Sequence, residues 1–166
     1  VQKFNKRQHT DIATLAFFCR GANISILKKE FLKTKIIKKP LGIIFHVPPN
    51  NIPTNFAYSF IFSLLLGNSN MIRISRKLLD HSGKLVKIID KLMSEKYRKI
   101  YENNYFVFYD KSHEINLKLN SICDGRMIWG SNETVKYFKK IVTQPHTKDI
   151  FFYDRYSISI IKSEFL

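Results

Sequence analysis

Residues 41–53 read LGIIFHVPPNNIP, and this stretch decides the fold of the chain. Its first half is an apolar run that predicts a buried strand, and its second half is a turn rich in Pro and Asn. The apolar segment FAYSFIFSLLL at 56–66 follows as a helix, and MIRIS at 71–75 predicts a second strand that ends in a cation and a hydroxyl. This βαβ unit puts polar groups at the carboxyl ends of its strands, where open α/β sheets bind ligands.

Strand and helix patterns alternate from Pro40 onward. Such alternation predicts an α/β fold, a Rossmann-like parallel sheet with helices on both faces. We expect strands over 41–47, 70–75, 105–109, 125–129, 149–152 and 157–161, and helices over 54–66, 78–99, 112–122 and 131–142.

The first part of the chain differs in pattern from this region. Residues 11–31 carry apolar side chains at helical spacing, interrupted by Gly21, which predicts one or two short helices. Residues 28–39 hold six lysines and read as a solvated connector, although an anionic surface is an alternative ligand for them. We therefore expect a helical segment with a basic linker over 1–39 and a dinucleotide-binding domain over 40–166.

The ends of the chain indicate a piece of a longer enzyme. The sequence begins on Val1 rather than Met, and it ends on a strand pattern with no covering helix. We expect the α/β domain to be truncated before a catalytic domain.

Composition limits the classes of function. The 28 Lys and Arg against 13 Asp and Glu give a net charge of +15, which favours anionic partners such as nucleic acid, an acidic membrane or a phosphate-bearing cofactor. Two cysteines without metal-ligand spacing give neither a disulfide framework nor a zinc site. The longest apolar run, 56–66, is about half of a membrane span, so the default expectation is a cytoplasmic protein with no membrane span.

Four motifs stand in a fixed order along the chain. They are GIIFHVPPNNIP at 42–53, GN at 67–68, RIS at 73–75 and WGSNE at 129–133. In this order they resemble the aldehyde dehydrogenase superfamily, and most closely its LuxC-type acyl-CoA reductase branch. The resemblance covers roughly residues 40–161. It implies an NADPH-dependent reductase that converts an acyl-CoA or other acyl thioester to an aldehyde through a Cys acyl-enzyme.

The resemblance gives Asn51 a catalytic role. In the superfamily, the Asn at the matching place donates a hydrogen bond to the oxyanion that forms when a thiolate attacks the carbonyl. The alternative is that Asn50 and Asn51 only cap a turn and start a helix.

Arg73, Ser75 and Arg76 match the superfamily segment that meets the adenosine ribose. Arg76 stands where the family has Glu, a residue that bonds the ribose 2′-hydroxyl, and a cation there favours a 2′-phosphate instead. This departure predicts NADPH as the cofactor. The alternative is that Arg76 and Lys77 are exposed charges at a helix start, which is an electrostatically poor place for them unless an anion is near.

Gly130 and Ser131 resemble the superfamily's cofactor turn. Gly130 would let the backbone approach a pyrophosphate, and Ser131 with the first amides of the next helix would bind it. The alternative is a plain Ser N-cap.

The general base that ordinary aldehyde dehydrogenases use to activate water is absent from its usual place. The family's general-base Glu falls on Phe152, which favours acyl reduction over oxidation. Asp154 and Arg155 have two readings, a structural pair at a strand turn or a catalytic pair. Neither Cys19 nor Cys123 matches the nucleophile, so the nucleophilic Cys is expected beyond this chain. His46, on a buried strand without a second ligand, reads as a core histidine.

Three hypotheses follow. The leading one is the cofactor-binding part of an acyl-CoA reductase, with an acyl-transferring or homologous subunit as a possible partner and no nucleic acid. The second is a basic nucleic-acid-binding module that stacks bases on its aromatic residues. The third is a catalytically inactive interaction subunit, which predicts a stable fold without cofactor binding.

Overall fold

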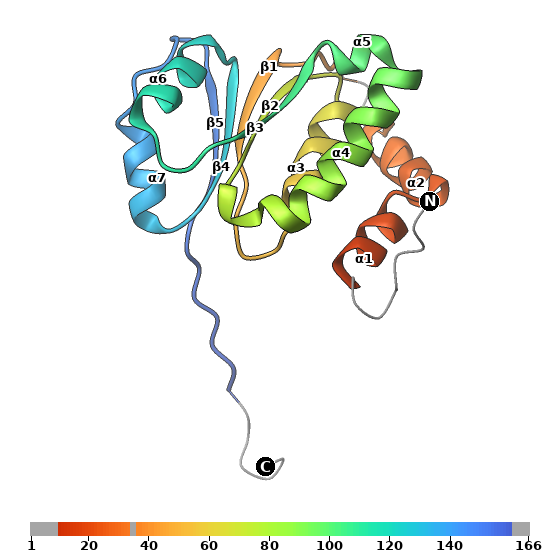
Figure 1. Ribbon diagram of the computed structural model, residues 1–166, viewed down its shortest axis with the longest axis horizontal. Helices are drawn as coiled ribbons and strands as arrows, with labels where there is room; N and C mark the ends of the chain where they lie inside the picture. The colour runs from red at the N-terminus through yellow and green to blue at the C-terminus, as the bar shows by residue number, and fades with distance from the viewer. Residues whose placement is uncertain (1–9, 34–35, 161–166) are drawn as a thin grey trace.

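The computed structural model describes residues 10–33 and 36–160, and its centre is a five-stranded sheet. All neighbouring strands run parallel, in the order β3-β2-β1-β4-β5 (Figure 1). The strands are β1 (Ile43–Val47), β2 (Ser69–Ile74), β3 (Asn104–Phe108), β4 (Gly125–Trp129) and β5 (Lys148–Phe152). The predicted parallel α/β sheet is therefore confirmed.

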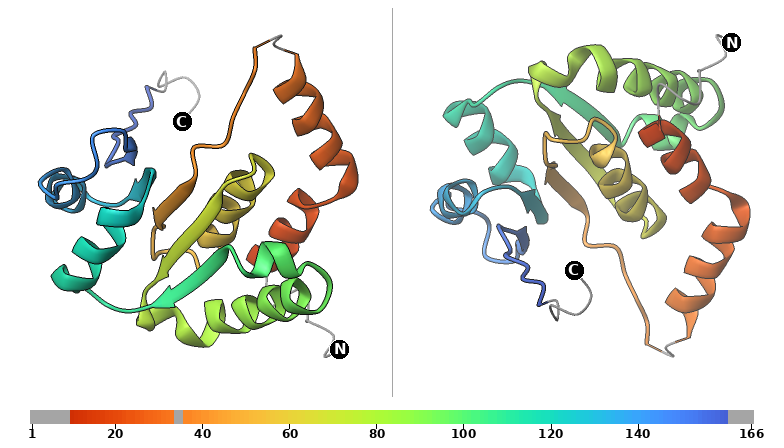
Figure 2. Two further views of the ribbon diagram at one scale, coloured as in Figure 1. Left: turned by 90° about the horizontal axis from the view of Figure 1, so that it is seen from above. Right: turned by 90° about the horizontal axis from the view of Figure 1, so that it is seen from below.

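Helices cover both faces of this sheet. α3 and α4 lie on one face, and α6 and α7 lie on the other (Figure 2). The helices are α1 (Thr10–Phe18), α2 (Gly21–Leu32), α3 (Asn55–Leu65), the 3₁₀ turn η1 (Arg76–Leu78), α4 (Leu79–Lys96), α5 (Arg98–Tyr101), α6 (His113–Ile122) and α7 (Asn132–Lys139). Along the chain, β2 and β3 are added on one side of β1, and β4 and β5 are then added on its other side. The switch point of the sheet therefore lies between β1 and β4.

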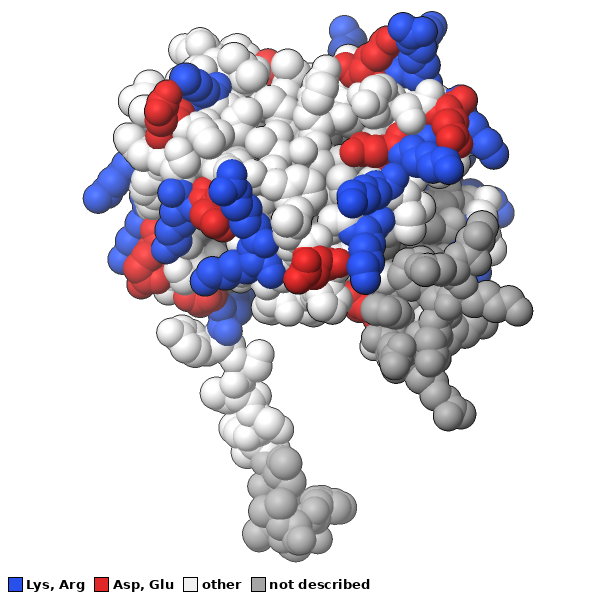
Figure 3. Space-filling view, viewed as in Figure 1, with Lys and Arg blue, Asp and Glu red and all other residues white. Residues whose placement is uncertain are grey.

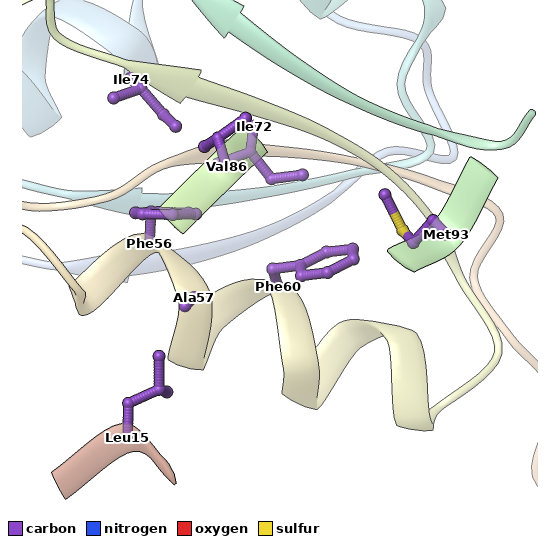
Figure 4. Close-up of a cluster of buried hydrophobic side chains, with 8 residues drawn as sticks. All are labelled: Leu15, Phe56, Ala57, Phe60, Ile72, Ile74, Val86 and Met93. Carbon is purple, nitrogen blue, oxygen red and sulfur yellow. The ribbon is translucent and has the colours of Figure 1, made fainter. Parts of the chain in front are cut away.

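One hydrophobic cluster lies between the sheet and the α3–α4 face. It joins buried side chains of α1, α3, β2 and α4, and Figure 4 shows all of them: Leu15, Phe56, Ala57, Phe60, Ile72, Ile74, Val86 and Met93. Phe18 of α1 also contacts the rings of Tyr58 and Phe62, with centroids 5.1 and 5.3 Å apart. The predicted N-terminal helices therefore exist, and α1 packs on α3.

A second cluster fills the opposite face of the sheet. Its buried members come from β1, β2, β4, α7 and the adjoining loops: Phe45, Val47, Met71, Cys123, Ile128, Phe138 and Ile141. Strand β1 is buried on both sides, since its side chains from Ile44 to Val47 are all buried.

His46 lies in the centre of the sheet and is fully buried. Its Nδ1 lies 2.7 Å from the Ser59 hydroxyl, and its Nε2 lies 2.9 Å from Oδ1 of Asn70. The Asn70 amide donates to Asn104, so Nε2–H donates to Oδ1 and Nδ1 accepts from Ser59. Burial lowers the pKa of His46 to about 4, against a smaller opposing effect of the Asn70 hydrogen bond. The interpretation of His46 as a core histidine is confirmed.

The amino edge of the sheet is closed by side chains that bond the backbone. Oδ1 of Asn68 accepts from the amide of Leu41 at 2.8 Å, and Oδ2 of Asp124 accepts from the amide of Ile43 at 2.7 Å. Asp124 also lies 2.9 Å from Nε2 of His146. The Ile43 amide, followed by His146, holds the pKa of Asp124 below its usual value.

Two predicted segments differ from the structure. No strand forms over Ser157–Ile160, where the side chains of Ile158 and Ile160 are 88% and 92% exposed; Ile161, the last residue of that prediction, lies outside the described residues. The apolar alternation is typical of a strand, but a strand also needs a neighbour to bond its backbone. The predicted connector over 28–39 is wrong at its start, since α2 continues to Leu32.

Candidate nucleotide-binding site

A cleft of ≈ 790 Å³ opens at the carboxyl edge of the sheet. Residues from the ends of β1, β2 and β4, together with the loop after β3 and the start of α7, line it. Val47 and Trp129 mark the ends of β1 and β4 on its wall, so the cleft lies at the switch point. Its size falls within the range of about 300–1,000 Å³ that is typical of small-molecule sites.

Arg73 forms a cationic part of the wall. Its Nε donates to the carbonyl of Tyr109 at 3.5 Å, and its guanidinium lies 5.0 Å from the centre of the Tyr109 ring. Tyr109 is buried, and its hydroxyl donates to Oδ1 of Asn116 at 2.7 Å. Burial raises the pKa of Tyr109 far above its usual value, so the phenol stays neutral. A fixed neutral ring therefore positions Arg73 at the cleft.

The turn after β2 presents Ser75 and its neighbours. The Ser75 hydroxyl accepts from the amide of Lys77 and donates to Oδ1 of Asp110, both at 3.4 Å. The amide of Arg76 donates to the same Asp110 oxygen at 3.3 Å. Ser75, Lys77, Asp110 and Lys111 line the cleft.

Arg76 lies differently from its prediction. Its side chain is exposed and is not part of the cleft lining, whereas Lys77 and Lys111 are. The chain leaves the strand at Ser75 and turns into η1, so consecutive side chains no longer alternate between two faces.

The turn after β4 forms the opposite wall. Trp129 stacks on Phe152, with ring centroids 3.7 Å apart and planes 10° from parallel. Nε1 of Trp129 is a buried donor for which the described residues provide no acceptor. The amide of Gly130 donates to the carbonyl of Phe152 at 3.0 Å, so it is already used by the sheet.

Ser131 caps α7, and its hydroxyl accepts from the amide of Thr134 at 3.4 Å. A Cβ on Gly130 would lie 2.8 Å from Cβ of Thr134, so helix packing alone requires a glycine there. The amide of Asn132, the first residue of α7, donates to Oδ2 of Asp154 at 3.2 Å. A carboxylate thus sits where the sequence predicts a phosphate, and this turn is able to bind an anion.

Asn51 is exposed in the turn after β1 and is not part of the cleft lining, whereas its neighbour Asn50 is. The structure therefore brings together Arg73, Ser75, Gly130 and Ser131 of the predicted site, and it leaves Asn51 and Arg76 at the margin. Sequence reasoning missed Asp110 and Lys111. Both directly follow a predicted strand, and that position was the available signal.

Neither cysteine belongs to the cleft. Cys123 is fully buried, and burial raises the pKa of its thiol to about 11. Cys19 lies between α1 and α2, and burial raises its pKa as well.

The described residues contain no group of three or more His, Cys, Asp or Glu that could hold a metal ion. Over the same residues, no helix is both long and apolar enough to cross a membrane.

The parallel sheet and the cleft at its switch point define an α/β protein with a Rossmann-like fold. The family model for acyl-CoA reductase (LuxC) matches residues 26–165, which is most of the chain. The protein therefore belongs to the LuxC acyl-CoA reductase family, whose members reduce acyl thioesters with a nicotinamide cofactor. No curated protein matches the chain.

Proposed function

We propose that this chain is the cofactor-binding part of an acyl-CoA reductase and that it prefers NADPH to NADH. The observation that carries the proposal is the cleft at the switch point, which has cations at one end and the start of α7 at the other. The start of a helix suits the pyrophosphate of a dinucleotide, and cations at the other end suit a 2′-phosphate on its adenosine ribose.

The charges at the β2 end support a phosphorylated ribose. Arg73, Lys77 and Lys111 all line this part of the cleft, and Ser75 adds a hydroxyl. Three cations against the single carboxylate of Asp110 leave an excess of positive charge in this lining, which attracts a phosphate. Arg76 contributes from outside the lining, as a charge next to the same turn.

The donors at the α7 end support the pyrophosphate position. The amide of Asn132 already bonds one carboxylate oxygen, and the Ser131 hydroxyl stands beside it at the cleft. The unpaired Nε1 of Trp129 is a further donor that fits a polar ligand in this region.

The reduction divides its tasks between this chain and another part of the enzyme. The nicotinamide supplies a hydride to the acyl carbon when it is bound. In the proposal, a Cys outside this chain carries the acyl group, since Cys123 is a buried thiol with a raised pKa and Cys19 lies away from the cleft. Asn51 donates to the oxyanion, and Asn50 is the neighbouring residue that lines the cleft.

Titration of the purified chain with NADPH and NADH tests the proposal, with fluorescence of Trp129, the single tryptophan, as the signal. We expect saturable quenching by both and a lower Kd for NADPH. The double change Arg73→Ala and Arg76→Ala is expected to weaken NADPH binding by about 10- to 100-fold, because a phosphate loses two cations. Arg98→Ala is the control, since Arg98 at the start of α5 pairs with Glu102 just after that helix and lies outside the cleft lining.

Unchanged NADPH binding in the double variant would contradict the cofactor assignment. No response of the folded chain to either dinucleotide would favour an inactive interaction subunit.

The structure offers little support for the nucleic-acid module. On the face shown in Figure 3, Lys and Arg are interspersed with Asp and Glu, and the ion pairs Arg98–Glu102 and Lys118–Glu114 occur among the exposed side chains. Strong, salt-dependent binding of an oligonucleotide would restore that hypothesis.

A further inference from the structure

We propose that Asp110 is a specificity-determining residue of this cleft and that it limits the preference for NADPH over NADH. This inference rests on the proposed function, since it concerns the ribose end of the same site. It goes further by assigning a role to a carboxylate from the loop after β3, a segment to which the sequence motifs assign no role.

The sheet itself places Asp110 next to the turn after β2. Ile74 pairs with Phe108 in the β2–β3 ladder, and the amide of Tyr109 donates to the carbonyl of Ile74 at 3.2 Å. The next residue, Asp110, therefore emerges beside Ser75, and its Oδ1 accepts from the Ser75 hydroxyl and the Arg76 amide. Strand pairing therefore sets the position of the Asp110 backbone beside this turn.

The two hydrogen bonds of Asp110 are long, at 3.4 and 3.3 Å, and the residue is exposed. Long bonds at an exposed carboxylate hold it weakly, so its oxygens stay available to another donor. A ribose 2′-hydroxyl is such a donor, and carboxylates accept from this hydroxyl in dinucleotide sites of this fold class. Asp110 therefore favours the unphosphorylated ribose.

The same carboxylate opposes a 2′-phosphate. The charged side chains lining the described cleft are Arg73, Lys77, Lys111 and Asp110, so three cations face one anion. The cations attract the phosphate, and Asp110 repels it from within the same turn. The balance between these charges sets the ratio of the two dissociation constants, and removing the single negative charge shifts this ratio toward NADPH.

Asp110 also has a structural task that must be separated from this role. By accepting from the Arg76 amide it caps the start of η1. Loss of a cap loosens the turn and weakens both dinucleotides to a similar extent. The ratio of the two dissociation constants is therefore the decisive quantity, because a purely structural role leaves it unchanged.

The experiment compares the wild-type chain with Asp110→Asn, which retains the shape and one acceptor oxygen but removes the charge. Fluorescence titrations with NADPH and NADH at 0.15 M salt are expected to show NADPH binding tightened about tenfold and NADH binding weakened about threefold. AMP and its 2′-phosphorylated form, used as probes of the adenosine end alone, are expected to show the same change of ratio.

Two further variants serve as controls. Asp110→Glu keeps the charge and is expected to retain the wild-type ratio. Asp80→Asn removes an exposed carboxylate from the first turn of α4, outside the cleft lining, and is expected to change neither dissociation constant. Thermal unfolding of each variant establishes that the folded state is the one titrated.

The failure of this inference differs from the failure of the proposed function. A wild-type chain that binds NADPH while Asp110→Asn keeps the wild-type ratio would overturn the role of Asp110 and leave the cofactor site intact. Equal weakening of both dinucleotides, with a lower Tm, would reduce Asp110 to a cap and overturn it as well. A folded wild-type chain that binds neither dinucleotide would overturn the proposed function together with this inference.

Discussion

The two edges of the sheet carry similar polar residues but use them in opposite ways. At the amino edge, Asp124 and Asn68 accept from backbone amides at 2.7 and 2.8 Å. At the carboxyl edge, Asp110 accepts from Ser75 and from the amide of Arg76 at 3.4 and 3.3 Å, and both Asp110 and Ser75 line a cleft. The first set is satisfied within the fold, and the second keeps bonding capacity for a ligand.

This difference gives a criterion for separating structural from functional polar groups. Groups with short bonds to buried partners stabilise the fold, because breaking such a bond leaves an unsatisfied polar atom. Groups with long bonds at a cleft add little to stability and can exchange their partner for a ligand. Changes at the amino edge should therefore alter stability, and changes at the carboxyl edge should alter binding.

The largest effect is expected at the amino ends of β4 and β5. Arg126 is buried, and it donates to both carboxylate oxygens of Asp149 at 2.6 Å. Asp149→Ala leaves this buried guanidinium without its counter-charge. Because the Asp149 side chain is itself 33% exposed, we expect the free energy of unfolding to fall by about 3 kcal/mol, the lower end of the range for a buried pair. Urea denaturation measures the change.

A matched control for this change is Glu114→Ala. Glu114 pairs with Lys118 at 2.7 Å, but both side chains are more than 70% exposed, and such pairs contribute little. Equal losses of stability in the two variants would contradict the distinction between buried and exposed pairs on which the comparison rests.

The second effect is a pH dependence that comes from His46, between the two edges. The pKa of the buried ring is about 4, against 6.5 for a free ring, so the unfolded chain binds the proton first as the pH falls. The contribution of His46 to stability is complete above pH 6.5 and is lost between 6.5 and 4, by about 3 kcal/mol in total.

Denaturation at several pH values tests this prediction in the wild-type chain and in His46→Gln. The variant is expected to be less stable at pH 7, since Ser59 and Asn70 lose their partner. It should also have a shallower loss of stability between pH 6.5 and 4. Parallel curves for the two proteins would show that another group causes the acid sensitivity.

Sequence reasoning found the order of the elements because that information is local. Residues 41–75 show a strand, a turn, a helix and a second strand through periodicity alone, and the structure confirms them. The expectation of a ligand site at the carboxyl ends of the strands followed from the same pattern. Ser75, Gly130 and Ser131 were predicted from their match to motifs of a known family, and all three line the cleft.

The missed features depend on which segments become neighbours. Asp110 acts on Ser75 because β3 pairs with β2, and no periodicity within either strand states that pairing. Likewise, Gly130 was predicted for its approach to a ligand, but the structure shows a packing reason in Thr134 of the following helix. The alternation at 157–160 was misread for the same reason, since a strand depends on a partner.

The third prediction concerns a glycine at the amino edge. Gly42 has φ +122°, and a Cβ there would lie 2.1 Å from Oδ2 of Asp124. Gly42→Ala should therefore push away the carboxylate that accepts from Ile43, with an expected loss of about 2 kcal/mol. Gly21→Ala is the control, because a Cβ there meets nothing within 4 Å. A thermal-unfolding comparison that shows equal Tm values would contradict the tight closure of this edge.

The smallest effect is expected at the carboxyl edge, where Asp154 accepts from the amide of Asn132 at 3.2 Å. Asp154 is exposed, so Asp154→Ala should change stability by less than about 0.5 kcal/mol. If the α7 amides bind the cofactor pyrophosphate, the carboxylate competes with it, and the variant should bind both dinucleotides about two- to threefold more tightly.

The Asp154→Ala variant distinguishes a carboxylate that competes with the pyrophosphate from one that supports the turn, because the two roles predict opposite changes in dinucleotide affinity. If the Asp154 carboxylate only maintains the shape of the turn, its loss disorders the binding site, and dinucleotide binding in Asp154→Ala weakens. The effect should also be equal for NADPH and NADH, since both carry the same pyrophosphate, whereas a change at Asp110 alters their ratio. Fluorescence titration of the two variants side by side therefore assigns each carboxylate to its own end of the cleft.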